Sequence, residues 1–323
     1  MKAVFIRRYG GNDVLEYGEL PAPVPRAGQV LVEVHAASVN PRDWLVRDGR
    51  YLLARFAGGF PLVLGSDFSG VVAGAGRGSR RFAPGAPVFG MQTALGGFGA
   101  YAEYVAIDED VLAEKPMELT HEQAAAIPCA GLTAYQALAE IGRVGGGTKV
   151  TIVGASGGVG SYAVQFARAL GAEVAGVTST ANVALARSLG ADRVVDYRQA
   201  RFAEVLSGQD VIFDTIGRES LRSCAPVLAR SGRYITTIPN RRSFVEAFTS
   251  RFARALAFGS ARSCHVVTVR ADGAQLAKIA AWIAEGRVRS VIDSVYPLAD
   301  ARAALEKSRS FRSRGKLVLS VKP

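Results

Sequence analysis

The chain has 323 residues, of which 49% are hydrophobic and 21% charged, and its formal net charge is +11. This length fits two domains, and the composition is that of a water-soluble globular protein. No apolar run approaches the roughly 18 residues of a transmembrane helix, and the start reads directly into a strand, so we expect a cytoplasmic protein without a signal peptide. The arginines are scattered, so we interpret the charge as a surface bias and expect no nucleic-acid partner.

The first 117 residues read as mostly β-structure. Residues 30–36 alternate with the period of two of a half-buried strand, and short strands around 71–72 and at 101–105 follow, separated by Gly- and Pro-rich turns. From about residue 120, apolar runs alternate with helical stretches. Six such runs predict βαβ units and a parallel, doubly wound sheet: 149–153, 173–177, 193–197, 210–214, 232–237 and 265–269.

After a predicted helix at 274–285, the chain returns to short strands at 291–293 and 316–319. We expect these strands to complete the first domain. The predicted fold is therefore α/β, with a discontinuous β-rich domain at residues 1–117 and 290–323 and a doubly wound domain at 118–289.

The segment 241–262 combines a stripe of apolar residues at helical spacing with several arginines around it. Hydrophobic residues recur every four positions at Phe244, Phe248, Phe252 and Leu256. Arginines stand around them at Arg241, Arg242, Arg251, Arg254 and Arg262. A basic amphipathic helix can lie on a membrane surface. Aromatic stripes more often face a core, so we expect this one to pack onto the protein itself.

The most informative motif is the glycine-rich turn after residues 150–153. In the dinucleotide fingerprint one glycine allows a tight turn, a second lets the backbone approach a pyrophosphate, and a third lets the helix pack on the strand. Gly157 and Gly160 match the second and third positions, and Ala155 replaces the first. The following helix N-terminus offers free N–H groups to an anion. We predict a bound dinucleotide.

The segment after the second strand of this domain bears on which dinucleotide binds. NAD sites place an acidic residue there, whereas residues 178–182 read Thr-Ser-Thr-Ala-Asn. Hydroxyl groups can donate to the 2′-phosphate that a carboxylate would repel, so NADPH is favoured. No Lys or Arg stands at 181–182, so a site that also accepts NADH is the alternative. Arg187 lies downstream, and Tyr197 could donate its phenol.

Several segments in order resemble the zinc-independent quinone oxidoreductase branch of the medium-chain dehydrogenase/reductase superfamily. They are SVNPRD (38–43), LGSDFSGVV (64–72), GFGAYAEY (97–104), AAAIP (124–128), GLTAYQAL (131–138), DTIG (214–217) and GKLVL (315–319). The resemblance implies a GroES-like catalytic domain, a Rossmann domain inserted in it, a cofactor in the cleft between them, and a homodimer formed through the edges of the Rossmann sheets.

The zinc ligands of related alcohol dehydrogenases are missing. Those enzymes carry a Cys, a His-Glu pair and a second Cys in the regions where this chain has Val39-Asn40, Ser66-Asp67 and Cys129. One soft ligand cannot hold a catalytic zinc, so no metal site is predicted. Cys129, Cys224 and Cys264 form no CxxC pair, and Cys129 is interpreted as a small buried residue.

The resemblance also assigns residues to the site. The pyrophosphate contacts are Ser156, Gly157, Gly158 and Val159. The adenosine phosphate faces Ser179, Thr180 and Tyr197. The nicotinamide side is lined by Asn40 and Thr133, and Ile216 belongs to the cofactor site. The candidate catalytic residues are Asn40 and Tyr51. Where the family often has a tyrosine two residues after the aspartate, this chain has Leu45, so the quinone side of the site departs from the family pattern here. Asp43 and Arg47 match the family but are equally interpretable as a structural ion pair.

These assignments predict an NADPH-dependent reductase of quinones or α,β-unsaturated carbonyls that works by direct hydride transfer without a metal. Conjugation delocalises the negative charge that zinc would otherwise stabilise. The proton comes from solvent or from Tyr51. The alternatives are an enoyl-thioester reductase and a non-catalytic NADPH-binding protein with a membrane- or nucleic-acid-binding role.

Overall fold

The chain, a computed structural model that describes residues 1–51, 59–92, 99–256 and 261–322, forms two units. Unit 1 comprises Met1–Leu132 and Arg270–Pro323, and unit 2 comprises Thr133–Val269. Of the family segments above, Gly97 and Phe98 lie outside the described residues.

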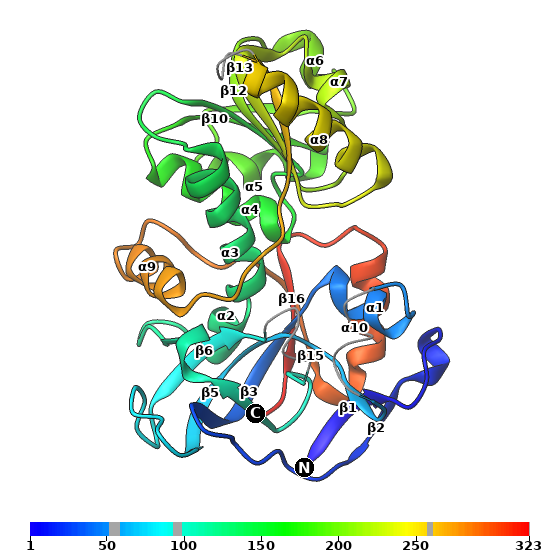
Figure 1. Ribbon diagram of the computed structural model, residues 1–323, viewed down its shortest axis with the longest axis vertical. Coiled ribbons are helices and arrows are strands. Elements are labelled where there is room, and N and C mark those ends of the chain that lie inside the picture. The colour runs from blue at the N-terminus through cyan, green and yellow to red at the C-terminus, as the bar shows by residue number, and fades with distance from the viewer. Residues whose placement is uncertain (52–58, 93–98, 257–260, 323) are drawn as a thin grey trace. The chain divides into compact units, whose positions relative to one another are not determined.

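Unit 2 contains a six-stranded sheet with every strand parallel to its neighbours. Its strands are β9 (Lys149–Val153), β10 (Glu173–Thr178), β11 (Arg193–Asp196), β12 (Gln209–Asp214), β13 (Leu228–Thr236) and β14 (Ser263–Val266). They lie in the order β11-β10-β9-β12-β13-β14, so the chain enters at the middle and winds outward to both sides (Figure 1). This is the strand order of dinucleotide-binding domains, and it confirms the predicted doubly wound sheet.

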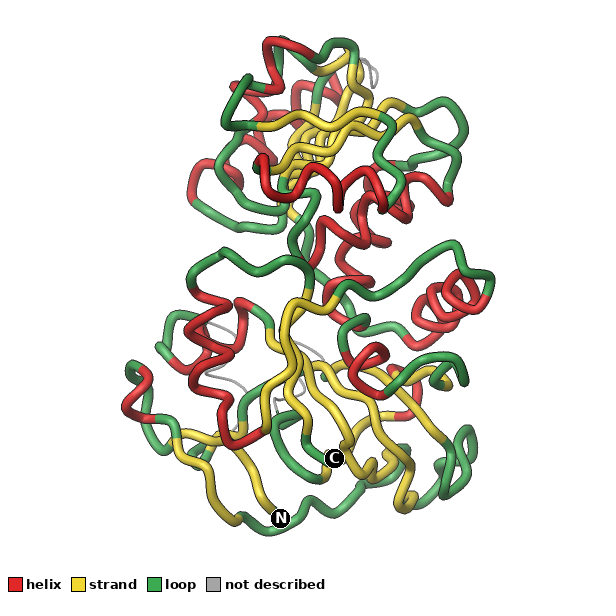
Figure 2. Tube along the Cα trace, turned by 180° about the vertical axis from the view of Figure 1, so that it is seen from behind, coloured by secondary structure: helices red, strands yellow, loops and turns green. Residues whose placement is uncertain are grey.

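Helices pack around this sheet, as Figures 1 and 2 show. They are α4 (Gly158–Ala169), α5 (Val183–Ser188), α6 (Phe202–Val205), α7 (Leu221–Cys224) and α8 (Arg241–Leu256), with the short turn η5 (Thr180–Asn182) and a π-helical segment η4 (Gln136–Gly142). The helix α3 (Pro128–Tyr135) runs across the boundary between the units. Because both faces are covered, the last four residues of β9 are all buried, as their continuous apolar run indicates.

Unit 1 is built on two β-sheets. Its strands are β1 (Lys2–Ile6), β2 (Glu16–Glu19), β3 (Gln29–Val39), β4 (Leu62–Val63), β5 (Asp67–Ala75), β6 (Pro87–Met91), β7 (Tyr104–Asp108), β8 (Leu112–Glu114), β15 (Ile292–Pro297) and β16 (Lys316–Ser320). One sheet has the order β2-β1-β4, and the other has β15-β16-β3-β5-β6-β8, with β7 pairing with β3. The C-terminal strands therefore complete the sheet of the N-terminal part, as expected.

The helices of unit 1 are α1 (Pro41–Arg47), α2 (His121–Ala125), α9 (Gly273–Ala284) and α10 (Ala301–Arg309), with single turns η1 (Asn12–Val14), η3 (Glu109–Val111) and η6 (Leu298–Asp300). The unit boundaries differ from the expected 117/118 and 289/290. The reason is packing, because α2 lies against β3 and β5, and α9 lies against β8. Both helices thus join the β-rich unit.

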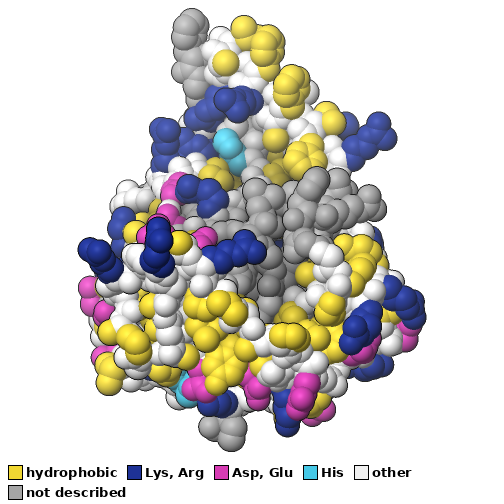
Figure 3. Space-filling model, turned by 60° about the horizontal axis from the view of Figure 1, so that its bottom comes forward, with side chains coloured by type: hydrophobic (Ala, Val, Ile, Leu, Met, Phe, Trp, Pro, Cys, Tyr) yellow, Lys and Arg dark blue, Asp and Glu magenta, His cyan; other side chains and the backbone are white. Residues whose placement is uncertain are grey.

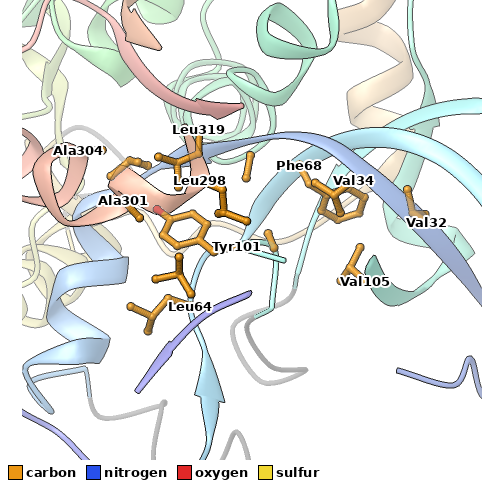
Figure 4. Packing of buried hydrophobic residues seen from close by; sticks show 14 of the residues in the cluster. Val32, Val34, Leu64, Phe68, Tyr101, Val105, Leu298, Ala301, Ala304 and Leu319 are labelled. Carbon is orange, nitrogen blue, oxygen red and sulfur yellow. The ribbon is translucent and has the colours of Figure 1, made fainter. Parts of the chain in front are cut away.

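The core of unit 1 gathers residues from both ends of the chain. The ring of Tyr101 is fully buried and lies among Leu64, Leu298 and Leu319 (Figure 4). Since Leu298 and Leu319 come from the C-terminal segment, this core ties that segment to the N-terminal sheet.

The structure corrects the expectation for the apolar stripe. The predicted helix is present as α8, but Phe244, Phe248, Phe252 and Leu256 are 58%, 78%, 66% and 69% exposed. The helix instead packs its small residues onto the sheet: Ser243 and Ser250 are buried, and the Ser250 hydroxyl accepts a hydrogen bond from the Cys264 N–H at 2.9 Å. Within the described part of the chain, no helix has the length and apolarity to cross a membrane.

Candidate functional site: a nucleotide-binding turn and a buried polar cluster

The glycine-rich turn in unit 2 connects β9 to α4. Gly154 follows the strand directly and has φ = +84°, in the left-handed region that favours glycine. A Cβ on Gly160 would lie 2.0 Å from the carbonyl oxygen of Gly154, so only glycine lets the helix approach the strand there. Gly160 thus has the packing role predicted for it. The residue that has the backbone conformation of the tight turn is Gly154, one position before Ala155. The fixed spacing of the motif had assigned this role to position 155, and so it missed Gly154.

The N-terminus of α4 suits an anionic ligand. Gly157 is its N-cap residue, and no described side chain caps this end by a hydrogen bond. The first N–H groups of a helix have no acceptor within the helix, and they carry the positive end of its dipole. A Cβ on Gly157 would meet only the Gly154 carbonyl oxygen, at 3.4 Å, so the space beside this residue is open. Residues 156–159 therefore fit the pyrophosphate of a dinucleotide.

A cluster of small polar side chains lies beside this turn, at the end of β10. The Ser156 and Thr178 hydroxyls are 2.8 Å apart, and the Asn182 Nδ2 group donates to Ser156 at 3.0 Å and to Ser179 at 3.3 Å. The buried Oδ1 atom of Asn182 has no hydrogen-bond partner among the described residues. Sequence reasoning tested position 182 only for positive charge, and so missed that its amide joins the two serines.

Thr180 and Tyr197, both predicted to face the adenosine phosphate, differ in whether their hydroxyl groups are available to a ligand. The Thr180 hydroxyl donates to the Asp196 carboxylate at 2.6 Å, and this bond lowers the pKa of Asp196. Its hydrogen is therefore already used within the protein. Tyr197 is 56% exposed and stands directly after β11, so its phenol is accessible to a ligand.

The loop after β12 brings Ile216 to the glycine turn. The buried Asp214 carboxylate accepts from the N–H groups of Ile216 and Gly217, both at 2.9 Å, and so holds this loop in a tight turn. A Cβ on Gly154 would lie 2.8 Å from the Ile216 side chain. The structure thus places Ile216 next to the turn, whereas Thr133 is buried in α3.

In unit 1, Asn40 lies in a buried hydrogen-bonded cluster with Asp67 and Lys316. The Asn40 Nδ2 group donates to Asp67 at 3.0 Å, and the Lys316 ammonium donates to Asn40 Oδ1 at 2.6 Å. The ammonium is 3.8 Å from the Asp67 carboxylate. The register explains this meeting, since Leu317 of β16 pairs with Val39 of β3, which brings the residues before and after them together. Sequence reasoning did not single out Lys316.

Asp67 is the centre of this cluster. It is fully buried, and its carboxylate also accepts from the Ser38 hydroxyl at 3.0 Å, the Ser66 hydroxyl at 3.2 Å and the Cys129 N–H at 3.2 Å. A buried carboxylate needs such donors and a counter-charge to remain in the core. Lys316, only 4% exposed, supplies the counter-charge.

The donors in this cluster do not fit zinc. The positions of the missing zinc ligands, residues 40, 66, 67 and 129, do come together, but an amide, a hydroxyl, a carboxylate and a thiol stand there beside an ammonium. Desolvation raises the pKa of the Cys129 thiol to about 12, so it is protonated at neutral pH. Zinc is bound by several thiolate, imidazole or carboxylate ligands, of which this cluster offers only the Asp67 carboxylate, and the Lys316 cation beside it would repel the metal. The described residues include no group of three or more His, Cys, Asp and Glu that could hold a metal ion.

Asp43 and Arg47 do not pair with each other, which removes the ion-pair interpretation. The Asp43 carboxylate accepts from the Tyr101 hydroxyl at 2.7 Å and the Asn40 N–H at 2.8 Å, while Arg47 pairs with Asp48. Burial raises the pKa of Asp43 to about 6. Tyr51 packs against the core of unit 1, with its ring centre 5.9 Å from the guanidinium carbon of Arg42.

Comparison with known proteins identifies the class of protein to which this fold and glycine-rich turn belong. Residues 26–117 match the model of the alcohol dehydrogenase GroES-like domain, and residues 189–319 match that of zinc-binding dehydrogenases. The chain belongs to the medium-chain dehydrogenase/reductase superfamily, and it is a nicotinamide-dependent oxidoreductase.

Within that superfamily, the chain belongs to the quinone oxidoreductase branch. It is 32% identical to the chloroplastic quinone oxidoreductase QR1 of Triphysaria versicolor over 99% of this chain and 98% of that protein. The structure of the quinone oxidoreductase from Coxiella burnetii is similar with a TM-score of 0.89 and 30% identity, covering 100% and 99% of the two chains. The Escherichia coli quinone oxidoreductase complexed with NADPH has a TM-score of 0.83 and 26% identity, covering 99% of this chain and all of that one.

Proposed function

We propose that this protein reduces quinones or α,β-unsaturated carbonyl compounds with NADPH, without a metal ion. The observation that carries the proposal is the Lys316 ammonium in the Asn40–Asp67 cluster, because this cation stands among the residues that replace the zinc ligands. Such a site favours substrates that stabilise the developing negative charge by their own conjugation.

We assign the following roles to the residues of the proposed site. Bound NADPH supplies the hydride. Ser156, Gly157, Gly158 and Val159 hold the pyrophosphate, and Ser179, Tyr197 and Asn182 face the adenosine phosphate. Ile216 packs beside the glycine turn, and Thr133 and Asn40 line the nicotinamide side. The proton comes from solvent or from Tyr51.

Asn40 is the residue in unit 1 with the best-defined orientation. Lys316 donates to its Oδ1 atom and Asp67 accepts from its Nδ2 atom, so the amide cannot be flipped without breaking both bonds. One Nδ2 hydrogen is used in the bond to Asp67, and the other is left to donate to a carbonyl oxygen of the ligand. Lys316 and Asp67 are thus positioning residues for Asn40.

Rapid mixing of the protein and NADPH with a panel of small quinones and enones tests this proposal. We expect NADPH oxidation with these substrates, and activity that survives exhaustive treatment with a metal chelator. Turnover restricted to enoyl thioesters would identify the related reductase instead. Tight NADPH binding without turnover on any of these compounds would show a non-catalytic protein and overturn the proposal.

The coenzyme preference gives a sharper prediction. Replacing Ser179 with aspartate puts a carboxylate where the 2′-phosphate is proposed to lie, so we expect NADPH binding to weaken by about tenfold or more through charge repulsion. NADH lacks this phosphate, and its affinity should change less than threefold. Calorimetric titration of both coenzymes measures the two effects. Equal losses for the two coenzymes would place the 2′-phosphate elsewhere.

The protein is also proposed to form a homodimer through the edge of the unit 2 sheet. In support, β14 is the last strand of this sheet and pairs only with β13 among the described strands. An edge strand is a natural pairing site, and among the backbone groups of β14 the Cys264 N–H is already bonded to the Ser250 hydroxyl of α8. Analytical ultracentrifugation gives the mass directly, and a monomer throughout the micromolar range would contradict this assembly.

A further inference from the structure

Helix α8 presents an apolar stripe that the described protein leaves uncovered. Phe244, Phe248, Phe252 and Leu256 repeat every four residues, and each is more than half exposed, as is the neighbouring Val245 at 57%. Residues four apart lie one turn above each other on a helix, so these side chains form one continuous row. Isolated exposed hydrophobic residues are ordinary, but a row of three phenylalanines and a leucine marks a contact surface.

The same helix is strongly basic. It contains four arginines and a single acidic residue, Glu246, which pairs with Arg242. Arg254 donates to the carbonyl oxygens of Ser231 and Ala261, so it holds the helix to its own unit.

Arg241 and Arg251 are the cations nearest to the stripe. Both are exposed, and they stand three residues before Phe244 and three after Phe248, so they border the row of apolar side chains. Figure 3 shows hydrophobic and basic side chains next to each other on unit 2, in the region of α8. Any partner must therefore accept apolar side chains and cations together.

The geometry points to an anionic lipid membrane as that partner, and we propose that α8 lies along such a membrane with its stripe among the acyl chains. Phenylalanine and leucine on one face with arginine at its borders is the pattern of a helix that lies in the interface plane. The lipid headgroups supply the negative charges that Arg241 and Arg251 need. A second copy of this chain is less suitable, because two such faces would bring arginine against arginine in a protein of net charge +11.

Sedimentation of the full-length protein with vesicles tests the proposal. We expect binding to vesicles that contain phosphatidylserine and at least tenfold weaker binding to vesicles of phosphatidylcholine alone. Added salt should weaken the first interaction, since it screens the arginine contacts.

Matched variants distinguish vesicle binding through the α8 surface from nonspecific binding by exposed hydrophobic or basic residues elsewhere. Phe248→Ser with Phe252→Ser should reduce vesicle binding at least tenfold, whereas Val24→Ser with Met117→Ser, at sites 84% and 83% exposed in unit 1, should leave it unchanged. Arg241→Gln with Arg251→Gln should also reduce binding, in contrast to Arg77→Gln with Arg312→Gln, which removes the same charge elsewhere. All four residues of the α8 variants are exposed, so coenzyme binding and the thermal unfolding temperature should stay at wild-type values.

Three results would overturn the proposal. The first is no binding to anionic vesicles, and the second is equal loss of binding in the α8 variants and in their controls. The third is a fall in oligomer mass when Phe248 and Phe252 are replaced, because that would show a second copy covering the stripe. None of these outcomes depends on quinone reduction, so this test stands apart from that of the proposed reaction.

Discussion

Replacing Gly157 with aspartate is expected to abolish the binding of both nicotinamide coenzymes while leaving the protein folded. Gly157 has φ = −82°, which any residue adopts, and an added Cβ would meet its nearest neighbour at an ordinary 3.4 Å. The new carboxylate would lie at the N-terminus of α4 and occupy the place of the pyrophosphate. We expect affinity to fall by about 100-fold or more, measured by calorimetric titration with NADPH and NADH.

Gly160 provides the control for this prediction, because it stands on the same turn but packs against backbone. Its Cβ would lie 2.0 Å from the Gly154 carbonyl oxygen, so Gly160→Ala should lower the thermal unfolding temperature of unit 2. Aspartate at 157 should leave that temperature near the wild-type value. If Gly157→Asp kept its coenzyme affinity, the dinucleotide would not bind at this turn.

Replacing Lys316 with methionine is expected to cost about 3–5 kcal/mol of unfolding free energy. The substitution keeps an unbranched side chain of similar length but removes the counter-charge of Asp67, which is fully buried. It also removes the hydrogen bond to Asn40 Oδ1. Unfolding in urea, followed by fluorescence and circular dichroism, measures the loss.

The double variant Lys316→Met with Asp67→Asn separates charge from packing. Neutralising both partners should restore a large part of the lost stability, because the uncompensated buried carboxylate is then gone. If the double variant were as unstable as the single one, packing around Lys316 would be responsible instead. In the folded double variant, kcat should be lower than in the wild type while KM for NADPH changes little, since Asn40 has lost the Lys316 donor to its Oδ1 atom and the charged acceptor of its Nδ2 group.

Features that depend on neighbours in the chain were readable from the residues alone. The apolar runs predicted the presence of the six strands of the parallel sheet, because a strand covered on both faces is hydrophobic along its length. The last run, 265–269, was misplaced, since it overlaps β14 only at residues 265–266. The glycine-rich turn was predicted because its glycines are needed by local backbone geometry and by close packing between adjacent elements. Even here, Gly154 was passed over, since a fixed spacing does not report which glycine has the positive φ.

The sequence by itself determined the fold class and the glycine-rich turn between β9 and α4, because both follow from periodicity and from the conformational freedom of glycine within short segments. Only the tertiary structure decided that Lys316 meets Asn40 and Asp67, since that contact joins strands far apart in the chain through the β3–β16 register. It likewise decided that the stripe of α8 faces outward. A helical pattern shows which residues share a face, whereas the surrounding elements determine whether that face is covered. Here the face of α8 that packs on the sheet is the one with Ser243 and Ser250.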